Sequence, residues 1–228
     1  MKKIIMDIFD FFEILYKYIQ ASIILGEDFI CPENITLLSK DVIFTKEYLK
    51  QLGKTIPKRR ILKQCRDGNF FLVPGPNRPM SFLELCETRK TECSIVEYQH
   101  KWCSKQDFAY KDKVGTGWYI IGKDIVNDSV SKRWHYQQLL LAKNEIVPNV
   151  TEFTWAIVIY KMINKIQLFR EIGVRTSSLD SGGNHLIISL RWTDYHDLYF
   201  DNYRSADVDD HKSNALGLSV AMKPDLKS

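Results

Sequence analysis

The run PNVTEFTWAIVIYKM, residues 148–162, organises the fold that the sequence predicts. Asn149 precedes Glu152 at the spacing of a capping box, which marks the start of a helix. From Phe153 onward, apolar side chains fall on almost every face of that helix. A helix that is apolar on most faces is surrounded by other elements. We therefore expect this helix at the centre of its domain.

Short strands are predicted on the C-terminal side of this helix. The segments 174–178 and 186–190 are rich in β-forming residues, and the turn sequence DSGGN at 180–184 separates them. Residues 198–203 and 216–222 predict two more strands. Helices followed by a group of short strands indicate an α+β fold.

The sequence before the central helix predicts two further strands and a second capping box. Residues 69–73 and 117–121 have strand composition, and a Pro- and Gly-rich turn at 74–79 ends the first of them. That turn lacks the G-x-x-x-x-G-K spacing of a phosphate-binding loop, so we reject a phosphate site there. Ser81 and Glu84 have the capping-box spacing.

Two shorter helices are predicted from apolar spacing. One is expected around 45–52, and the other at 131–142. In the second helix we expect Trp134, Leu139 and Leu140 to face inward.

Residues 4–25 predict an amphipathic N-terminal helix. We expect its apolar stripe to pack on the chain's own domain, with self-association or docking to a larger assembly as the alternative. Membrane-surface binding is disfavoured because the polar face is not rich in Lys or Arg. The apolar stripe consists of Ile4, Ile8, Phe11, Phe12, Leu15, Tyr16, Ile19 and Ile23, and the polar face of Asp7, Asp10, Glu13, Lys17 and Gln20.

Composition limits the protein class. The 228 residues are 45% hydrophobic and 12% aromatic, enough for a substantial core. No stretch reaches the ~18 uninterrupted apolar residues of a membrane span. Acidic residues interrupt the N-terminal apolar run, so we expect no signal peptide. We therefore expect a cytoplasmic or virion-associated protein.

The cysteines are odd in number and include no C-x-x-C pair, which argues against a disulfide scaffold and a zinc site. They are Cys31, Cys65, Cys86, Cys93 and Cys103.

Charge is unevenly distributed, although the net charge is only +4. Residues 46–66 contain eight cations and one anion, whereas residues 192–214 contain six Asp and two cations. A basic segment followed by Phe70 and Phe71 makes nucleic-acid binding the alternative function, because cations can neutralise phosphates and aromatic rings can stack on bases. The cations are Lys46, Lys50, Lys54, Lys58, Arg59, Arg60, Lys63 and Arg66.

The segment 192–214 has the composition of a binding surface. It is dominated by Asp, Asn, Ser, Tyr and His, which makes it too polar for a core and too aromatic for a solvated linker. Tyr supplies large, rigid contact area, while Asp, Asn and Ser supply adaptable hydrogen bonds. Predicted strands on both sides would hold its ends in place.

The order of these features resembles the variable proteins that are diversified by retroelements, which have a C-type-lectin fold of the formylglycine-generating-enzyme type. The similarity covers residues 110–225. It is carried by RTSS at 175–178, the Gly-containing hairpin and strand after it, the long polar segment, and the closing LGLSVAMK at 216–223, with GWYII at 117–121, Trp134 and EIVP at 145–148 upstream.

The resemblance implies a fold and a function. The fold is an α+β, C-type-lectin-like domain at 55–228, with short twisted antiparallel strands and two helices, preceded by an N-terminal helical segment at 1–54. The function is a non-enzymatic, receptor-type protein whose variable region, about 192–215, binds varied macromolecular targets, chiefly proteins. In such systems mutagenic reverse transcription scatters Asn codons to codons for Asp, Ser, Tyr and His. Selection for a polar binding loop would leave the same composition.

The resemblance also implies particular site residues. The scaffold positions are Arg175, Ser177, Ser178, Leu216, Gly217 and Leu218. The ligand-binding, varied positions are Tyr195, His196, Tyr199, Asp201, Asn202, Tyr203, Ser205, Asp207, His211, Ser213 and Asn214. The tyrosines at 195, 199 and 203 would be the aromatic anchors.

Catalytic and metal-dependent functions are not favoured. The histidines show no His-Glu-x-x-His pairing, and no spacing brings Ser177, His185 and Asp180 together as a triad. Members of the resembled fold that oxidise sulfatase cysteines use a cysteine pair late in the domain, whereas this chain has no cysteine after Cys103. The acidic cluster at 207–210 lacks EF-hand spacing for calcium. We therefore expect no catalytic residue, no metal and no cofactor.

Overall fold

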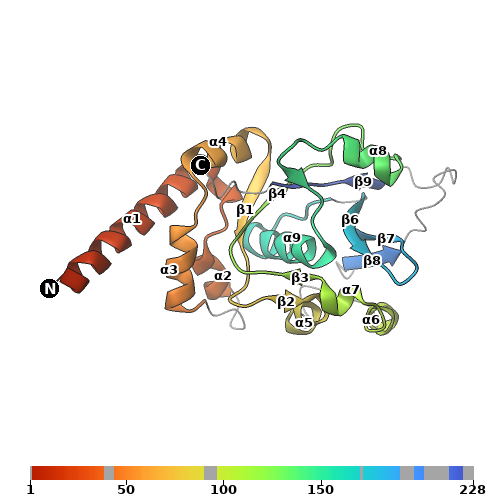
Figure 1. Ribbon diagram of the computed structural model, residues 1–228, viewed down its shortest axis with the longest axis horizontal. Coiled ribbons are helices and arrows are strands. Elements are labelled where there is room, and N and C mark those ends of the chain that lie inside the picture. The colour runs from red at the N-terminus through yellow and green to blue at the C-terminus, as the bar shows by residue number, and fades with distance from the viewer. Residues whose placement is uncertain are drawn as a thin grey trace.

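The computed structural model describes residues 2–38, 44–89, 97–169, 172–190, 198–202 and 216–222, and shows a mixed α+β fold (Figure 1). The helices are α1 (Lys2–Leu25), α2 (Pro32–Leu38), α3 (Lys46–Lys54), α4 (Arg59–Asp67), α5 (Phe82–Thr88), α6 (Glu97–Cys103), α7 (Phe108–Lys111), α8 (Trp134–Leu139) and α9 (Val150–Asn164). The strands are β1 (Phe70–Pro74), β2 (Met80–Ser81), β3 (Lys113–Val114), β4 (Trp118–Gly122), β5 (Glu145–Ile146), β6 (Gly173–Leu179), β7 (His185–Leu190), β8 (Leu198–Asn202), β9 (Leu216–Leu218) and β10 (Ala221–Met222).

Two four-stranded sheets form the framework. The first sheet has the strand order β1-β4-β10-β5, and the second has the order β8-β7-β6-β9. A separate two-stranded pair joins β2 and β3. In the second sheet β6 pairs antiparallel with β7 and parallel with β9.

Helix α9 lies between the two sheets, as Figure 1 shows, and contacts strands of both. The predicted central position of this helix is confirmed, because its side chains from Val150 to Tyr160 are buried with the exception of the half-buried Glu152. The indole N–H of Trp155 donates to the carbonyl of Pro74 in β1 at 2.8 Å, which ties the helix to the first sheet.

Both predicted capping boxes are present. The Asn149 side chain accepts from the backbone N–H of Glu152 at 2.9 Å, and the Glu152 carboxylate accepts from the backbone N–H of Asn149 at 2.9 Å. Ser81 and Glu84 make the same reciprocal pair at the start of α5. These bonds satisfy amide groups that have no partner inside a helix, so they fix where α5 and α9 begin.

The C-terminal run 216–222 forms two strands and not the single strand predicted. Strand β9 belongs to the second sheet, and β10 belongs to the first sheet. Between them, the Ser219 hydroxyl donates to the carbonyl of Gly122 at 3.0 Å, and the Val220 carbonyl accepts from the Gly122 N–H at 2.8 Å. The apolar run therefore crosses from one sheet to the other, and all of its described residues are buried in doing so.

Helix α8 presents the opposite face to that predicted. It spans 134–139 and not 131–142, and Leu139 and Leu140 are exposed, while Trp134 is half-buried. The fully buried residue is Gln137, whose amide has hydrogen-bonding partners inside the protein. A satisfied amide can occupy an inward position that the apolar pattern assigned to leucine.

Helix α1 forms as predicted, but its apolar stripe does not pack on the domain. Figure 1 shows α1 as a long helix whose N-terminal half extends beyond the other elements. The residues of α1 that reach the core are Ala21 and Leu25. From residue 11 on, every member of the predicted stripe is exposed, namely Phe11, Phe12, Leu15, Tyr16, Ile19 and Ile23. None of the described helices combines the length and apolar character needed to cross a membrane.

The buried apolar residues form one continuous core from Ala21 in α1 to Met222 in β10. Leu52 in α3 belongs to this core, and the Trp118 indole of β4 donates to its carbonyl at 2.9 Å. The N-terminal helices and the first sheet thus share one interior. The division of the chain at 54/55 stays a prediction.

Candidate ligand-binding surface

The second sheet holds both ends of the segment 203–215, which itself lies outside the described residues. Strand β8, which precedes the segment, is at one edge of the sheet, and β9, which follows it, is at the other edge. The intervening strands β7 and β6 bury Val174, Leu186 and Ile188 against the α9 side. The thirteen residues of this segment, at ~3.3 Å each, are long enough to cross a four-stranded sheet of ~4.8 Å spacing.

The β9 edge is fixed by hydrogen bonds to the loop before α8. The carbonyl of Leu216 accepts from Ser131 N–H at 3.0 Å, and the carbonyl of Leu218 accepts from Val126 N–H at 2.7 Å. The Leu218 N–H donates to the Ser129 hydroxyl at 3.0 Å. Gly217 has no room for a side chain, since a Cβ there would lie 2.4 Å from Cγ2 of Ile125.

Three of the predicted ligand-binding residues lie on the described backbone of β8. The register pairs Tyr199 with Ser189, Asp201 with Ile187, and Asn202 with Leu186. The other predicted positions lie outside the described residues, namely Tyr195, His196, Tyr203, Ser205, Asp207, His211, Ser213 and Asn214.

Most of the predicted scaffold residues occupy interior positions of the second sheet. Leu216, Leu218 and Arg175 are buried, and Ser177 is exposed. The Ser178 hydroxyl accepts from the Val150 N–H at 2.8 Å and also contacts the Asp112 carboxylate, so it joins β6 to the start of α9. The sheet is thereby locked to the central helix.

Helix α8 is joined to the second sheet through a buried polar network. The Arg175 guanidinium donates to Gln137 Oε1 at 2.6 Å, and Gln137 Nε2 donates to the carbonyl of Ser129 at 2.8 Å. Arg175 is 2% exposed, and this burial lowers its pKa. Its guanidinium also lies 3.4 Å from the Lys132 carbonyl.

An aromatic pair extends this contact toward β7. The Trp134 and His185 rings are 3.8 Å apart between centroids and inclined by 32°. Nδ1 of His185 lies 3.0 Å from the carbonyl of Thr176. Because β8 pairs Asn202 with Leu186, the residue next to His185, the chain leaves β8 beside this aromatic pair.

Sequence reasoning missed the outer face of α8 as part of the surface. Tyr136, Leu139 and Leu140 are all exposed there, and the His135 and Tyr136 rings lie 4.0 Å apart. Exposed aromatic and leucine side chains on the helix that carries Trp134 extend the candidate contact area. The clue to this face in the sequence is Gln137. Its buried position can be recognised only when its partner, Arg175, is known.

The stability of this region should fall as the pH drops below 6.5. Burial lowers the pKa of His185 below its ordinary value of 6.5, and the neighbouring Arg175 charge acts in the same direction. The unfolded chain therefore takes up the proton first, and stabilisation that is full above pH 6.5 is lost as the pH falls through the lowered pKa. Urea unfolding on either side of pH 6.5 measures this loss. His185→Phe, which cannot titrate, should reduce the pH dependence, and an unchanged profile in that variant would contradict the assignment.

The other chemistries considered from the sequence gain little from the geometry. Asp180 caps its own turn by accepting from the N–H groups of Gly182 and Asn184, both at 2.8 Å. Within the described ranges, no three His, Cys, Asp or Glu side chains are grouped to hold a metal ion. Cys65 and Cys103 are buried thiols, and burial raises the pKa of each to about 12.

The nucleic-acid alternative loses its aromatic component. Phe70 and Phe71 lie in the core on β1, so they cannot offer their rings to bases. The cations of 46–66 are exposed on and beside α3 and α4. The alternative therefore loses the two rings on which it was based, while the basic surface itself remains.

The candidate surface thus combines the backbone of β8 with the side chains of α8 and His185. Comparison of the chain with protein-family models, with curated proteins and with solved structures found no match. Residue chemistry and geometry are therefore what support a function.

Proposed function

We propose that the chain is a non-enzymatic, receptor-type binding protein with a C-type-lectin-like domain, whose segment 192–215 is diversified by a retroelement to recognise varied targets, chiefly proteins. One observation carries the proposal. The segment 203–215 joins the two opposite edges of a single sheet whose inner strands are buried. Its amino-acid composition is that of a paratope.

The strand arrangement supports tolerance to sequence change. Both flanking strands, β8 and β9, are paired within the second sheet, and β9 is also hydrogen-bonded to the loop before α8. The order of elements from α9 to β10 is the helix, hairpin, strand, polar segment and closing strand on which the resemblance rests. Substitutions between fixed ends leave the core contacts of the sheet in place.

A fixed rim next to a varied segment would suit a receptor. Trp134 and Tyr136 supply aromatic area that does not depend on diversification, and the segment after β8 supplies the residues that differ between targets. Aromatic anchors carry most of the binding energy in such interfaces, and the surrounding polar residues tune specificity.

A two-library experiment tests the proposal. In the first library the eleven predicted positions from Tyr195 to Asn214 are varied among Asn, Asp, Ser, Tyr, His and Ala, and most members should keep their free energy of unfolding within about 0.5 kcal/mol. A control library varies Val174, Leu186, Ile188 and Leu216 in the same way, and most of its members should fail to fold.

Selection of the first library against unrelated protein targets should then yield binders. Loss of folding across that library, or an absence of binders from a folded library, would contradict a diversified receptor.

The retroelement origin has its own test. The flanking DNA should contain a near-repeat of the codons for 192–214 and a reverse-transcriptase gene, and a neighbourhood with neither would leave only the binding role.

A further inference from the structure

A cavity of about 550 Å³ lies between α1 and the chain that connects α3 to α4, and we call it the basic pocket. Its described lining includes four cations and one anion, and the anion, Glu13, pairs with Lys17 at 2.7 Å. The remaining cations, Lys54, Lys58 and Arg59, are all exposed. An excess of positive charge in a concave surface focuses the electrostatic potential there and attracts anions.

Both walls of the basic pocket are held in place by the fold. One wall is the polar side of α1, and the other is the α3–α4 connection, in which Ile56 and Pro57 are buried. Helix α1 contacts both α3 and α4. Gly53 in the last turn of α3 permits this close approach, because a Cβ there would overlap the side chain of Ile14. The pocket therefore exists in the folded chain before any ligand binds, as small-ligand sites usually do.

An exposed aromatic ring lines the same pocket. Tyr16 is 64% exposed, and its hydroxyl accepts from Nε2 of Gln20 at 3.3 Å. A ring with that exposure offers a surface on which another flat ring can stack. The half-buried Ile61 adds apolar lining. The basic pocket thus provides for the two parts of a nucleotide, a flat base and a negatively charged phosphate.

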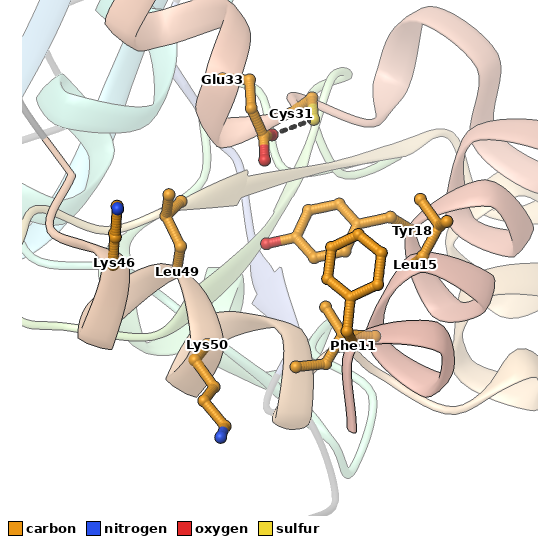
Figure 2. Close-up of a pocket in the computed structure, with 9 residues that line it drawn as sticks. Phe11, Leu15, Tyr18, Cys31, Glu33, Lys46, Leu49 and Lys50 are labelled. Atoms are coloured by element: carbon orange, nitrogen blue, oxygen red, sulfur yellow. Dashed lines mark hydrogen bonds between the residues drawn. The ribbon is translucent and has the colours of Figure 1, made fainter. Parts of the chain in front are cut away.

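The cavity on the opposite flank of α1, of about 580 Å³, is more apolar and has a carboxylate in its lining (Figure 2). Figure 2 shows the rings of Phe11 and Tyr18 in that cavity, whereas Lys50 extends away from them. The Glu33 carboxylate accepts from the Cys31 thiol at 2.6 Å, as the dashed line marks. A phosphate there would meet a like charge. Of the two cavities, the basic pocket is therefore the better match for phosphate.

Single-stranded nucleic acid is the partner that best matches these features. The bases of a duplex are stacked on one another, whereas those of a single strand can stack on a protein ring. Proteins that bind single strands without sequence preference combine cations for the backbone with aromatic rings for the bases. Arg60 and Lys63, which are exposed on α4, extend the positive potential beyond the pocket. That extension favours a strand with several phosphates over a free nucleotide.

We propose that the basic pocket binds single-stranded nucleic acid, with one base stacked on Tyr16 and the neighbouring phosphates neutralised by Lys54, Lys58 and Arg59. The stacking ring comes from α1 and not from β1, where the sequence placed it. This activity is independent of the proposed receptor function, because the pocket lies on the N-terminal helices, apart from the second sheet and α8 (Figure 1). One chain would therefore carry two separate binding sites.

Fluorescence anisotropy of the full chain with a labelled single-stranded oligothymidylate of about twenty nucleotides tests the phosphate contacts. The association constant should be measurable at about 50 mM salt, and its logarithm should fall against that of the salt concentration with a slope of about −2, as three phosphate contacts require. Lys58→Gln with Arg59→Gln removes two contacts and should reduce the slope to about −0.7. Arg133→Gln with Lys143→Gln is the matched control, since it removes one exposed Arg and one exposed Lys away from the pocket and should leave the slope unchanged.

Variants of Tyr16 test the stacking contact. Tyr16→Ala should weaken binding of the oligothymidylate by at least about fivefold, because it removes the ring on which a base stacks. Tyr16→Phe keeps the ring and should bind like the wild type, which separates the ring from the hydroxyl and its bond to Gln20. Tyr136→Ala removes a ring that is 54% exposed on α8 and should leave the affinity unchanged. An abasic strand with the same number of phosphates should bind the wild type more weakly, and Tyr16→Ala should not weaken it further.

Several outcomes would overturn the proposal, provided that circular dichroism shows each variant to be folded. Absence of binding at low salt would do so. A Tyr16→Ala variant that binds like the wild type, or an abasic strand that binds as tightly as the oligothymidylate, would reduce the site to a charged surface without stacking. Tighter binding of a duplex of the same length would assign the surface to double-stranded DNA. Vesicles containing phosphatidylserine that displace the oligothymidylate would assign it to lipid.

Discussion

Replacement of Trp155 by alanine should lower the free energy of unfolding by about 3–5 kcal/mol. Trp155 is 0% exposed at the middle of α9, between the two sheets. The substitution removes the largest fully buried side chain of the core and also leaves the Pro74 carbonyl of β1 without its indole donor. Urea unfolding of the purified variant, followed by circular dichroism, measures the loss.

Two further variants separate the contributions to that loss. Trp155→Phe keeps most of the buried apolar volume and removes the hydrogen bond, so it should cost less than the alanine variant. Leu139→Ala removes a side chain that is 77% exposed and should change the free energy of unfolding by less than about 0.5 kcal/mol. An alanine variant at 155 as stable as the Leu139 variant would mean that α9 is not the centre of the core.

The sequence predicted those features that depend on local chemistry. The capping box at Asn149 and Glu152 and the apolar run after it were enough to place α9 and to make it central. The hairpin turn was equally predictable, because Asp180-Ser181 followed by two glycines is a local turn signal, and the Asp180 carboxylate caps the turn. Such features are decided within a few residues of chain.

Faces of helices were harder to predict, because a partner decides which face is inward. In α8 the leucines pointed to one face, yet Arg175, 38 residues further along the chain, draws Gln137 inward. In α1 the stripe that contains Phe12, Leu15 and Ile19 is as apolar as a core-facing stripe, yet these side chains are exposed, while Ala21 and Leu25 are buried. Periodicity shows that a helix has an apolar face, and it does not show what that face meets.

The C-terminal run shows the same limit for strands. Leu216 to Met222 is apolar enough for one strand, but Ser219 bonds to Gly122 and the chain changes sheets at that point. No local residue encodes that change, since it depends on where β4 and β6 lie. Composition alone predicts a binding surface at 192–214, whereas the candidate contribution of α8 required the Trp134–His185 and Gln137–Arg175 contacts.

Replacement of Gln137 by leucine should cost about 2–4 kcal/mol of stability, although leucine is the more apolar residue at a fully buried position. The variant removes the 2.6 Å acceptor of the Arg175 guanidinium and leaves that charge buried with the weaker Lys132 carbonyl contact at 3.4 Å. Helix α8 should loosen from the second sheet as a result. Urea unfolding measures the stability, and near-ultraviolet circular dichroism reports the Trp134 environment.

The double variant Gln137→Leu with Arg175→Met distinguishes a buried-charge penalty from simple misfit. The cost of Gln137→Leu can be compared with that of the double variant. If the cost comes from an Arg175 guanidinium left buried without its acceptor, removing that charge should recover part of the stability. The double variant should then be more stable than the sum of the two single changes predicts. Additive losses would mean that leucine merely packs badly. Recovery would show that one polar contact decides which face α8 turns outward, and therefore which side chains border the candidate binding surface.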